Sequence, residues 1–155
     1  MPEGQKTVAT NRRARHDYDI EEVFEAGMVL TGPEVKSLRA GRASLMEAYG
    51  RVAGTEVWLE GMHVPPYAHA DQRDYDPRRA RKLLLHQREI QRLIGRTAER
   101  GFALVPMRVY FKRGRAKLEL GLGRGKRKYE KRQDIAKREH EREIERGMAR
   151  RRRGG

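Results

Sequence analysis

The side chains that could do chemistry in this chain are histidines and carboxylates. The five histidines lie at positions 16, 63, 69, 86 and 140, and no two have the HxxxH spacing that puts two metal ligands on one helical face. The run from His16 to Asp19 could suggest acid–base catalysis, but adjacent residues of an extended strand point to opposite sides. We therefore expect no metal, no cofactor and no catalytic residue, and we interpret this run as a binding contact.

The glycine-rich run from Gly121 to Lys126 has only part of a phosphate-loop pattern. Leu120 stands where such a loop needs its first glycine, and Lys126 is followed by Arg127 instead of Ser or Thr. No Ser, His and carboxylate signature of a nucleophilic enzyme occurs either. We expect these glycines to form a flexible exit from the last strand.

Two clusters of basic residues also contain side chains that can contact nucleotide bases. Asn11 and His16 flank three arginines, and Lys82 and His86 flank three leucines. Arginine planes, histidine and tyrosine can stack on unpaired bases, which is how RNA loops are usually read. The alternative is a set of solvated surface charges; the combined pattern favours RNA.

The C-terminal segment 124–155 is strongly cationic. It holds 14 Lys or Arg against 6 Asp or Glu, and Ile135 and Ile144 are its two large aliphatic residues. Such a segment cannot bury enough apolar surface to offset its ordering entropy, so we expect a mobile basic arm when it is free. The rest of the chain also carries a net positive charge, and the formal net charge of the whole chain is +14. Charge of one sign on both parts points to a phosphate-rich partner.

The arm also has a helical charge pattern. Arginines recur every four residues from Arg138 to Arg150, and their mutual repulsion opposes a helix until phosphates neutralise the row. We expect disorder to become helix on binding RNA. The alternative is a permanently disordered solubility tail.

Length and composition set the class of protein. The 155 residues suit one domain, residues 1–123, followed by the arm. The absence of cysteine excludes disulfides and fits a reducing compartment. No window approaches the roughly 20 apolar residues of a membrane span, so we expect a soluble, cytoplasmic monomer that does not bind membranes.

Apolar periodicity predicts the elements that position these groups. A first strand runs through 18–30 with an irregularity near Ala26–Gly27, and Gly32-Pro33 starts a short helix that ends before Gly41. Pro106 should mark an edge or a bulge in its strand. The other predicted elements are strands 49–52, 56–64, 102–111 and 116–122, a main helix over 87–100, and a long polar loop over 67–81.

Five to six strands joined mostly by hairpins, with a helix interrupting them, favour a closed barrel over a doubly wound parallel sheet. We predict a mostly β fold: a small oligonucleotide-binding-like closed barrel with two to three helices and a basic C-terminal tail.

Several motifs, in order along nearly the whole chain, resemble the SsrA-binding protein (SmpB) family. The matching stretches are 11–18 (NRRARHDY), 24–27 (FEAG), 34–39 (EVKSLR), 81–85 (RKLLL) and 125–132 (GKRKYEKR). The resemblance implies an RNA-binding protein without catalysis that binds transfer-messenger RNA and brings it to stalled ribosomes for trans-translation. Elongation factor Tu and alanyl-tRNA synthetase would be indirect partners through that RNA.

The resemblance also implies site residues. The RNA-binding candidates, taken from it and from the basic clusters, are Asn11, Arg12, Arg13, Arg15, His16, Glu25, Lys36, Arg39, Lys82, Leu84, His86, Lys126 and Lys128. The arm would enter the ribosomal decoding centre and messenger channel as a helix. Its implied ribosome contacts are Tyr129, Lys131, Arg132, Lys137, Arg138, Arg142 and Arg146.

Two other classes of protein remain open. A structural ribosomal protein would share the charge and the arm, and would stay on ribosomes throughout translation. An RNA-modifying enzyme or nuclease would need a cofactor or metal site that the sequence does not offer.

Overall fold

A computed structural model describes residues 5–67, 74–126 and 142. Seven strands and three helices occur within these residues. They are β1 (Gln5–Thr10), α1 (Ala14–Asp17), β2 (Tyr18–Met28), α2 (Gly32–Arg39), β3 (Tyr49–Ala53), β4 (Glu56–Glu60), β5 (Arg81–Leu84), α3 (Gln87–Thr97), β6 (Phe102–Lys112) and β7 (Arg115–Gly125).

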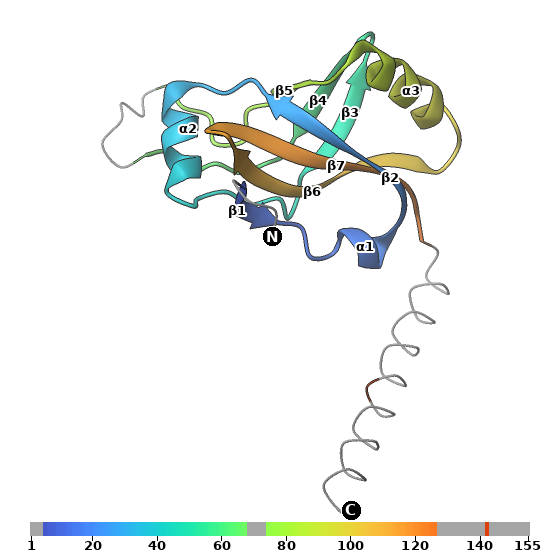
Figure 1. Cartoon of the computed structure of the whole chain (residues 1–155), viewed down its shortest axis with the longest axis horizontal. Coiled ribbons are helices and arrows are strands. Elements are labelled where there is room, and N and C mark those ends of the chain that lie inside the picture. Colours follow the sequence, from blue (N-terminus) through green and yellow to red (C-terminus); the bar gives the residue numbers. More distant parts are fainter. Residues whose placement is uncertain (1–4, 68–73, 127–141, 143–155) are drawn as a thin grey trace, which may run out of the picture. The chain divides into compact units, whose positions relative to one another are not determined.

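The strands form one antiparallel sheet that closes on itself (Figure 1). Their order is β1-β6-β3-β4-β5-β2-β7, and β7 also pairs with β6, so six strands make a ring to which β1 is added. Closure at two seams is short, with Gly50–Leu104 joining β3 to β6 and Gly27 and Met28 joining β2 to β5. The predicted mostly β closed barrel is confirmed.

The barrel interior is aliphatic. Alternating residues of β4 and β7, together with Leu83 of β5 and Leu93 of α3, are almost wholly buried, as period-2 strands with one face inward require. The long hairpin β6–β7 forms a large part of this wall, with pairing from Phe102–Arg124 to Lys112–Arg115 that shifts register between Pro106 and Arg108.

Several predicted elements are confirmed. Helix α2 begins at Gly32-Pro33 and is followed by Gly41 with φ of 79°, and its Thr31 and Glu34 form a reciprocal cap. Pro106 lies at a bulge between β6 and β7. Residues 74–80 of the predicted loop contain no helix or strand.

Other predictions were wrong. Residues 5–10, for which no strand was predicted, form β1, which pairs along β6, and His16 and Asp17 belong to the helical turn of α1 instead of an extended strand. The irregularity of β2 lies between Ile20 and Glu22. Gly27 instead pairs with Leu84 of β5, and a Cβ there would make an ordinary contact of 3.4 Å with the Leu84 Cβ.

The glycines at the end of β7 are not a flexible exit. The strand pairs with both β2 and β6 as far as Gly123–Gly125. A Cβ at Gly121 would press on Met107 and Ile20, and one at Gly123 would overlap the Asp19 carbonyl oxygen. These two positions need glycine because atoms of the adjacent strands approach too closely for a side chain to fit.

The chain divides into two units, Met1–Gly125 and Lys126–Gly155. Of the second unit, only Lys126 and Arg142 belong to the described residues. The predicted helical arm and its contacts at Lys128, Tyr129, Lys131, Arg132, Lys137, Arg138 and Arg146 therefore lie outside them. Within the described part of the chain, no helix is long and apolar enough to cross a membrane.

Candidate RNA interface

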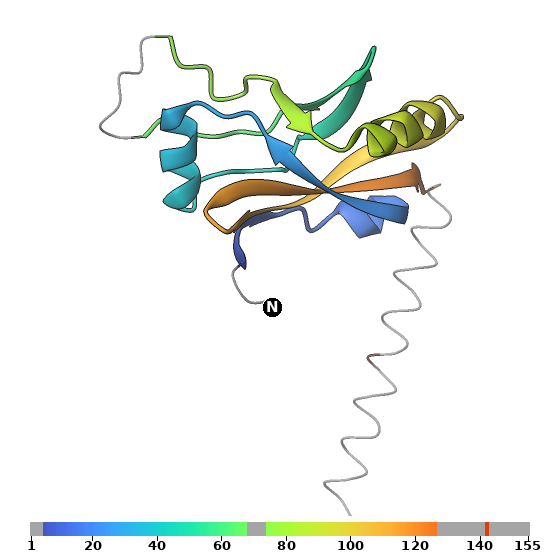
Figure 2. The same ribbon diagram turned by 45° about the horizontal axis from the view of Figure 1, so that its top comes forward.

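The predicted barrel contacts lie at two separate ends of the molecule. Helix α1 precedes β2 and α2 follows it, and a straight strand of this length spans about 33 Å. Both views place α1 and α2 at different ends of the barrel (Figures 1 and 2). We call residues 11–18 and their surroundings the α1 end, and α2 with Glu25, Leu84 and the β6–β7 turn the α2 end.

Asn11 fixes the backbone at the α1 end. Its Nδ2 donates to the Pro106 carbonyl at 2.9 Å and its backbone N–H donates to the Met107 carbonyl at 2.8 Å. Both acceptors belong to the β6 bulge, where a locally disrupted ladder leaves carbonyls free for such bonds. Asn11 thus positions its neighbours, and its Oδ1 remains the group that could meet RNA.

The arginines of the α1 end are presented on a small anchored turn. Ala14 is buried against Val105 and Met107, while Arg12, Arg13 and Arg15 around it are exposed. No carboxylate pairs with these three arginines among the residues that the structure describes. Cations without an internal partner are available to phosphates.

His16 contacts the next residue in the sequence. Its Nδ1 lies 2.9 Å from the Asp17 Oδ1. The expectation that the His16 and Asp17 side chains point to opposite sides of an extended strand is wrong, because both residues belong to the helical turn of α1. The pair orients the imidazole and leaves its other nitrogen for a ligand.

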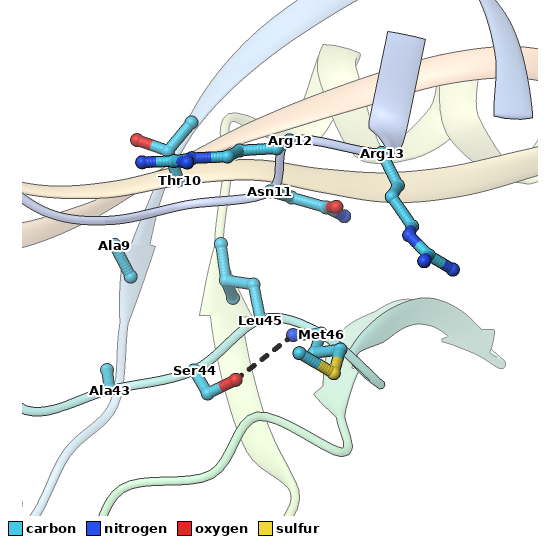
Figure 3. A pocket seen from close by; sticks show the side chains of 9 residues that line it. All are labelled: Ala9, Thr10, Asn11, Arg12, Arg13, Ala43, Ser44, Leu45 and Met46. Atoms are coloured by element: carbon cyan, nitrogen blue, oxygen red, sulfur yellow. Dashed lines mark hydrogen bonds between the residues drawn. The ribbon is translucent and has the colours of Figure 1, made fainter. Parts of the chain in front are cut away.

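A hollow of about 390 Å³ opens beside this turn. Figure 3 shows Asn11, Arg12 and Arg13 along one side and Ser44, Leu45 and Met46 along the other. Met46 is 85% exposed, although its backbone is held by a bond from its N–H to the Ser44 Oγ. An apolar surface beside arginines suits an unstacked base.

Glu25 is the centre of the α2 end. Its Oε2 accepts a 2.5 Å bond from the Tyr110 hydroxyl, and the Lys112 Nζ lies 3.4 Å from both carboxylate oxygens. The Tyr110 bond, with Lys112 and Lys117 nearby, holds the pKa of Glu25 below its usual range despite partial desolvation. Burial, followed by this bond, raises the pKa of Tyr110. Glu25 is therefore an ionised acceptor at neutral pH.

Cations that sequence reasoning missed surround Glu25. Lys112, Arg113, Arg115 and Lys117 line a cavity with it at the β6–β7 turn. Their signal in the sequence is the basic run 112–117, which lies where two apolar strands meet. Half-exposed Leu84 borders the adjoining cavity, which also contains Arg115 and Lys117.

Helix α2 adds Lys36 and Arg39 to this end. Both are exposed, with the Lys36 Nζ 5.8 Å from the centre of the Tyr67 ring and the Arg39 guanidinium 5.8 Å from that of Phe111. Phe111 lines the cavity beside Leu84. Arg39, Leu84 and Glu25 thus belong to one region.

A buried ionic network fixes α2. The Glu34 carboxylate, 1% exposed, accepts bonds of 2.6 Å from Arg81 and from Arg79. Arg81 is fully buried and also donates to the carbonyls of Met62 and Pro77. Burial opposes ionisation of Glu34, but the Arg79, Thr31 and Arg81 interactions outweigh it and lower its pKa. The loop prediction for Arg79–Arg81 missed this role.

Lys82 and His86 stand on either side of Leu84 in the sequence. The Lys82 Nζ pairs with the Glu56 Oε2 at 2.8 Å on the outer face of β4 and β5. His86 precedes α3, and its backbone N–H donates to the Glu89 carboxylate. Lys126 follows β7 directly. The other predicted barrel residues form two main groups, at the α1 end and at the α2 end.

This arrangement suits binding rather than chemical transformation. Exposed cations can neutralise phosphates, while Glu25, Asn11 and Leu84 can contact bases. No group of three His, Asp or Glu side chains that could hold a metal ion occurs in the described parts of the chain.

The comparisons with known proteins agree with one another. The SmpB protein family matches residues 8–150. The SsrA-binding protein of Acidothermus cellulolyticus is 56% identical over 151 residues, covering 97% of this chain and 95% of that protein. That of Thermobifida fusca is 57% identical over 150 residues, covering 97% and 94%. A chain in the solved structure "tmRNA-SmpB: a journey to the center of the bacterial ribosome" superposes with a TM-score of 0.64 and 49% identity, covering 77% of this chain and 84% of that one.

Proposed function

Because the chain belongs to the SmpB protein family, we propose that it contacts two RNAs through separate parts, transfer-messenger RNA through the barrel and ribosomal RNA through the arm. It is an SsrA-binding protein that works with transfer-messenger RNA on the ribosome in trans-translation. The family binds RNA and is not enzymatic.

The barrel contacts are proposed from exposure and charge. The observation that carries the assignment is the set of exposed arginines at 12, 13 and 15, which have no carboxylate partner among the described residues, together with the Glu25 cavity and its cations. The proposed transfer-messenger RNA contacts on the barrel are Asn11, Arg12, Arg13, Arg15, His16, Glu25, Lys36, Arg39, Lys82, Leu84 and His86, continued by Lys126 and Lys128.

The arm is proposed to enter the decoding centre and messenger channel. Its supporting observation is the charge of segment 124–155, with 14 basic against 6 acidic residues, which phosphates would neutralise. Tyr129, Lys131, Arg132, Lys137, Arg138, Arg142 and Arg146 are the proposed contacts. Elongation factor Tu and alanyl-tRNA synthetase would act through the RNA, with this protein present as a cytoplasmic monomer.

The test is recovery of RNA crosslinked to the full chain in cells. We expect transfer-messenger RNA to dominate and ribosomal RNA to crosslink mainly through residues 126–155. Constant stoichiometric presence in all ribosomes, without enrichment of transfer-messenger RNA, would instead indicate a structural ribosomal protein.

A further inference from the structure

A groove at the α1 end contains side chains that no motif of the sequence selected. The hollow of Figure 3 shares Asn11, Arg13 and Met46 with a second hollow of about 280 Å³ that reaches Tyr18 and Tyr49. The two hollows are therefore adjacent, and we call them together the Met46–Tyr49 groove.

The groove has exposed apolar side chains beside polar ones. Met46 is 85% exposed and Tyr49 is 54% exposed, and both line the second hollow, so they form a small exposed apolar patch instead of isolated surface residues. Leu45 and Leu104 are buried beneath them. The approach of β3 to Leu104 depends on Gly50, where a Cβ would lie only 2.5 Å from the Leu104 Cβ.

The charges along the groove favour an anion. Arg12 and Arg13 line it and have no carboxylate partner among the described residues. Two carboxylates also line it. Glu47 pairs with Arg78 at 2.9 Å, whereas Asp17 lies 2.9 Å from His16, which neutralises it only when protonated. Two arginines against the Asp17 carboxylate still leave the groove cationic.

We propose that the Met46–Tyr49 groove binds unpaired nucleotides of transfer-messenger RNA, with Tyr49 and Met46 against the bases and Arg12 and Arg13 on the phosphates. Exposed aromatic faces beside a cationic edge are the features with which proteins hold single-stranded RNA. Transfer-messenger RNA is the source because the groove continues the Asn11–Arg13 cluster assigned to that RNA. This inference rests on the proposed function.

The test compares full-length variants for affinity to the tRNA-like part of transfer-messenger RNA at several salt concentrations. Tyr49→Ala should weaken binding about 10-fold, within the range for loss of one base–aromatic contact, with an unchanged salt slope because stacking releases no counterion. Arg13→Ala should weaken binding and also flatten the slope, by about 0.7 for a single-stranded phosphate contact. Tyr49→Phe should restore affinity to within about threefold of wild type.

Two controls make the result decisive. Val23→Ala removes an exposed apolar side chain of β2 that lines neither hollow, and it should leave affinity unchanged. Thermal unfolding of Tyr49→Ala should match wild type, since more than half of that side chain is already exposed.

Three outcomes would each be informative. Equal affinity of Tyr49→Ala and wild type would overturn the groove while leaving the proposed function intact. If Tyr49→Ala lost binding to purified ribosomes but kept its affinity for transfer-messenger RNA, the choice of RNA would be overturned. Failure of the wild-type protein itself to bind transfer-messenger RNA would reject the proposed function.

Discussion

The Arg81 guanidinium donates a 2.6 Å hydrogen bond to the Glu34 carboxylate, and both side chains are at most 1% exposed. This pair joins the first turn of α2 to β5, across 47 positions of sequence. Because α2 presents Lys36 and Arg39 on its exposed side, a buried ion pair fixes the orientation of the cations proposed for RNA.

Breaking this pair should destabilise the fold strongly. Glu34→Gln leaves Arg81 buried and without its counter-charge, which we expect to cost about 3–5 kcal/mol of unfolding free energy. Urea denaturation measures this cost. Arg51→Met is the matched control, since it breaks an exposed pair with Glu60 and should cost about 1 kcal/mol or less. Similar small losses for both variants would contradict a structural role for the buried pair.

The Glu34 carboxylate should also make the free energy of unfolding depend on pH. The pKa of Glu34 is lower in the folded protein than its ordinary value of 4.5, so its contribution is present above pH 4.5 and is lost as pH falls through the folded pKa. Unfolding free energy should therefore decrease below about pH 4.5. Glu22, through Arg92, and Glu25, through Tyr110, act in the same direction.

Urea denaturation between pH 6 and pH 3 measures this dependence. Glu34→Gln should show a shallower decrease than wild type because it has no carboxylate to protonate at this position. An identical pH profile for the two proteins would show that Glu34 does not contribute to it.

Lys82 should bind RNA in competition with an internal partner. Its ammonium lies 2.8 Å from the Glu56 carboxylate, so phosphate must displace that carboxylate. Glu56→Gln is expected to raise affinity for transfer-messenger RNA severalfold, whereas Lys82→Ala lowers affinity and flattens its salt dependence. Salt titrations of binding provide the measurement. An unchanged slope in Lys82→Ala would remove this lysine from the interface.

The barrel could be predicted from the sequence because most of its strands and helices have signals within their own short stretches of sequence. The hairpin β6–β7 alternates apolar residues around a charged turn, and α2 has proline at its start and glycine after its end. Strand β1 was missed because its sequence, QKTVAT, has few large apolar residues. Its pairing with β6 is a tertiary contact that a single sequence does not reveal.

The site was predicted less completely for the same reason. Arg81 was grouped with loop cations, although it alternates with Lys82 and shares an inward position with Leu83, which is a period-2 signal. No local pattern could place Tyr110 against Glu25, 85 positions away. The groove between Met46 and Tyr49 likewise depends on how β3 and α1 meet in the folded chain.

Removal of the arm tests the central claim that two parts of the chain engage two RNAs. Strand β7 continues to Gly125, so truncation after Gly125 keeps every barrel strand. We expect this variant to lose only the share of its affinity for transfer-messenger RNA that Lys126 and Lys128 contribute and to keep its thermal stability, while tagging of peptides on ribosomes stalled at messages without a stop codon is abolished. Equal loss of RNA binding and tagging, or tagging that survives the truncation, would contradict it.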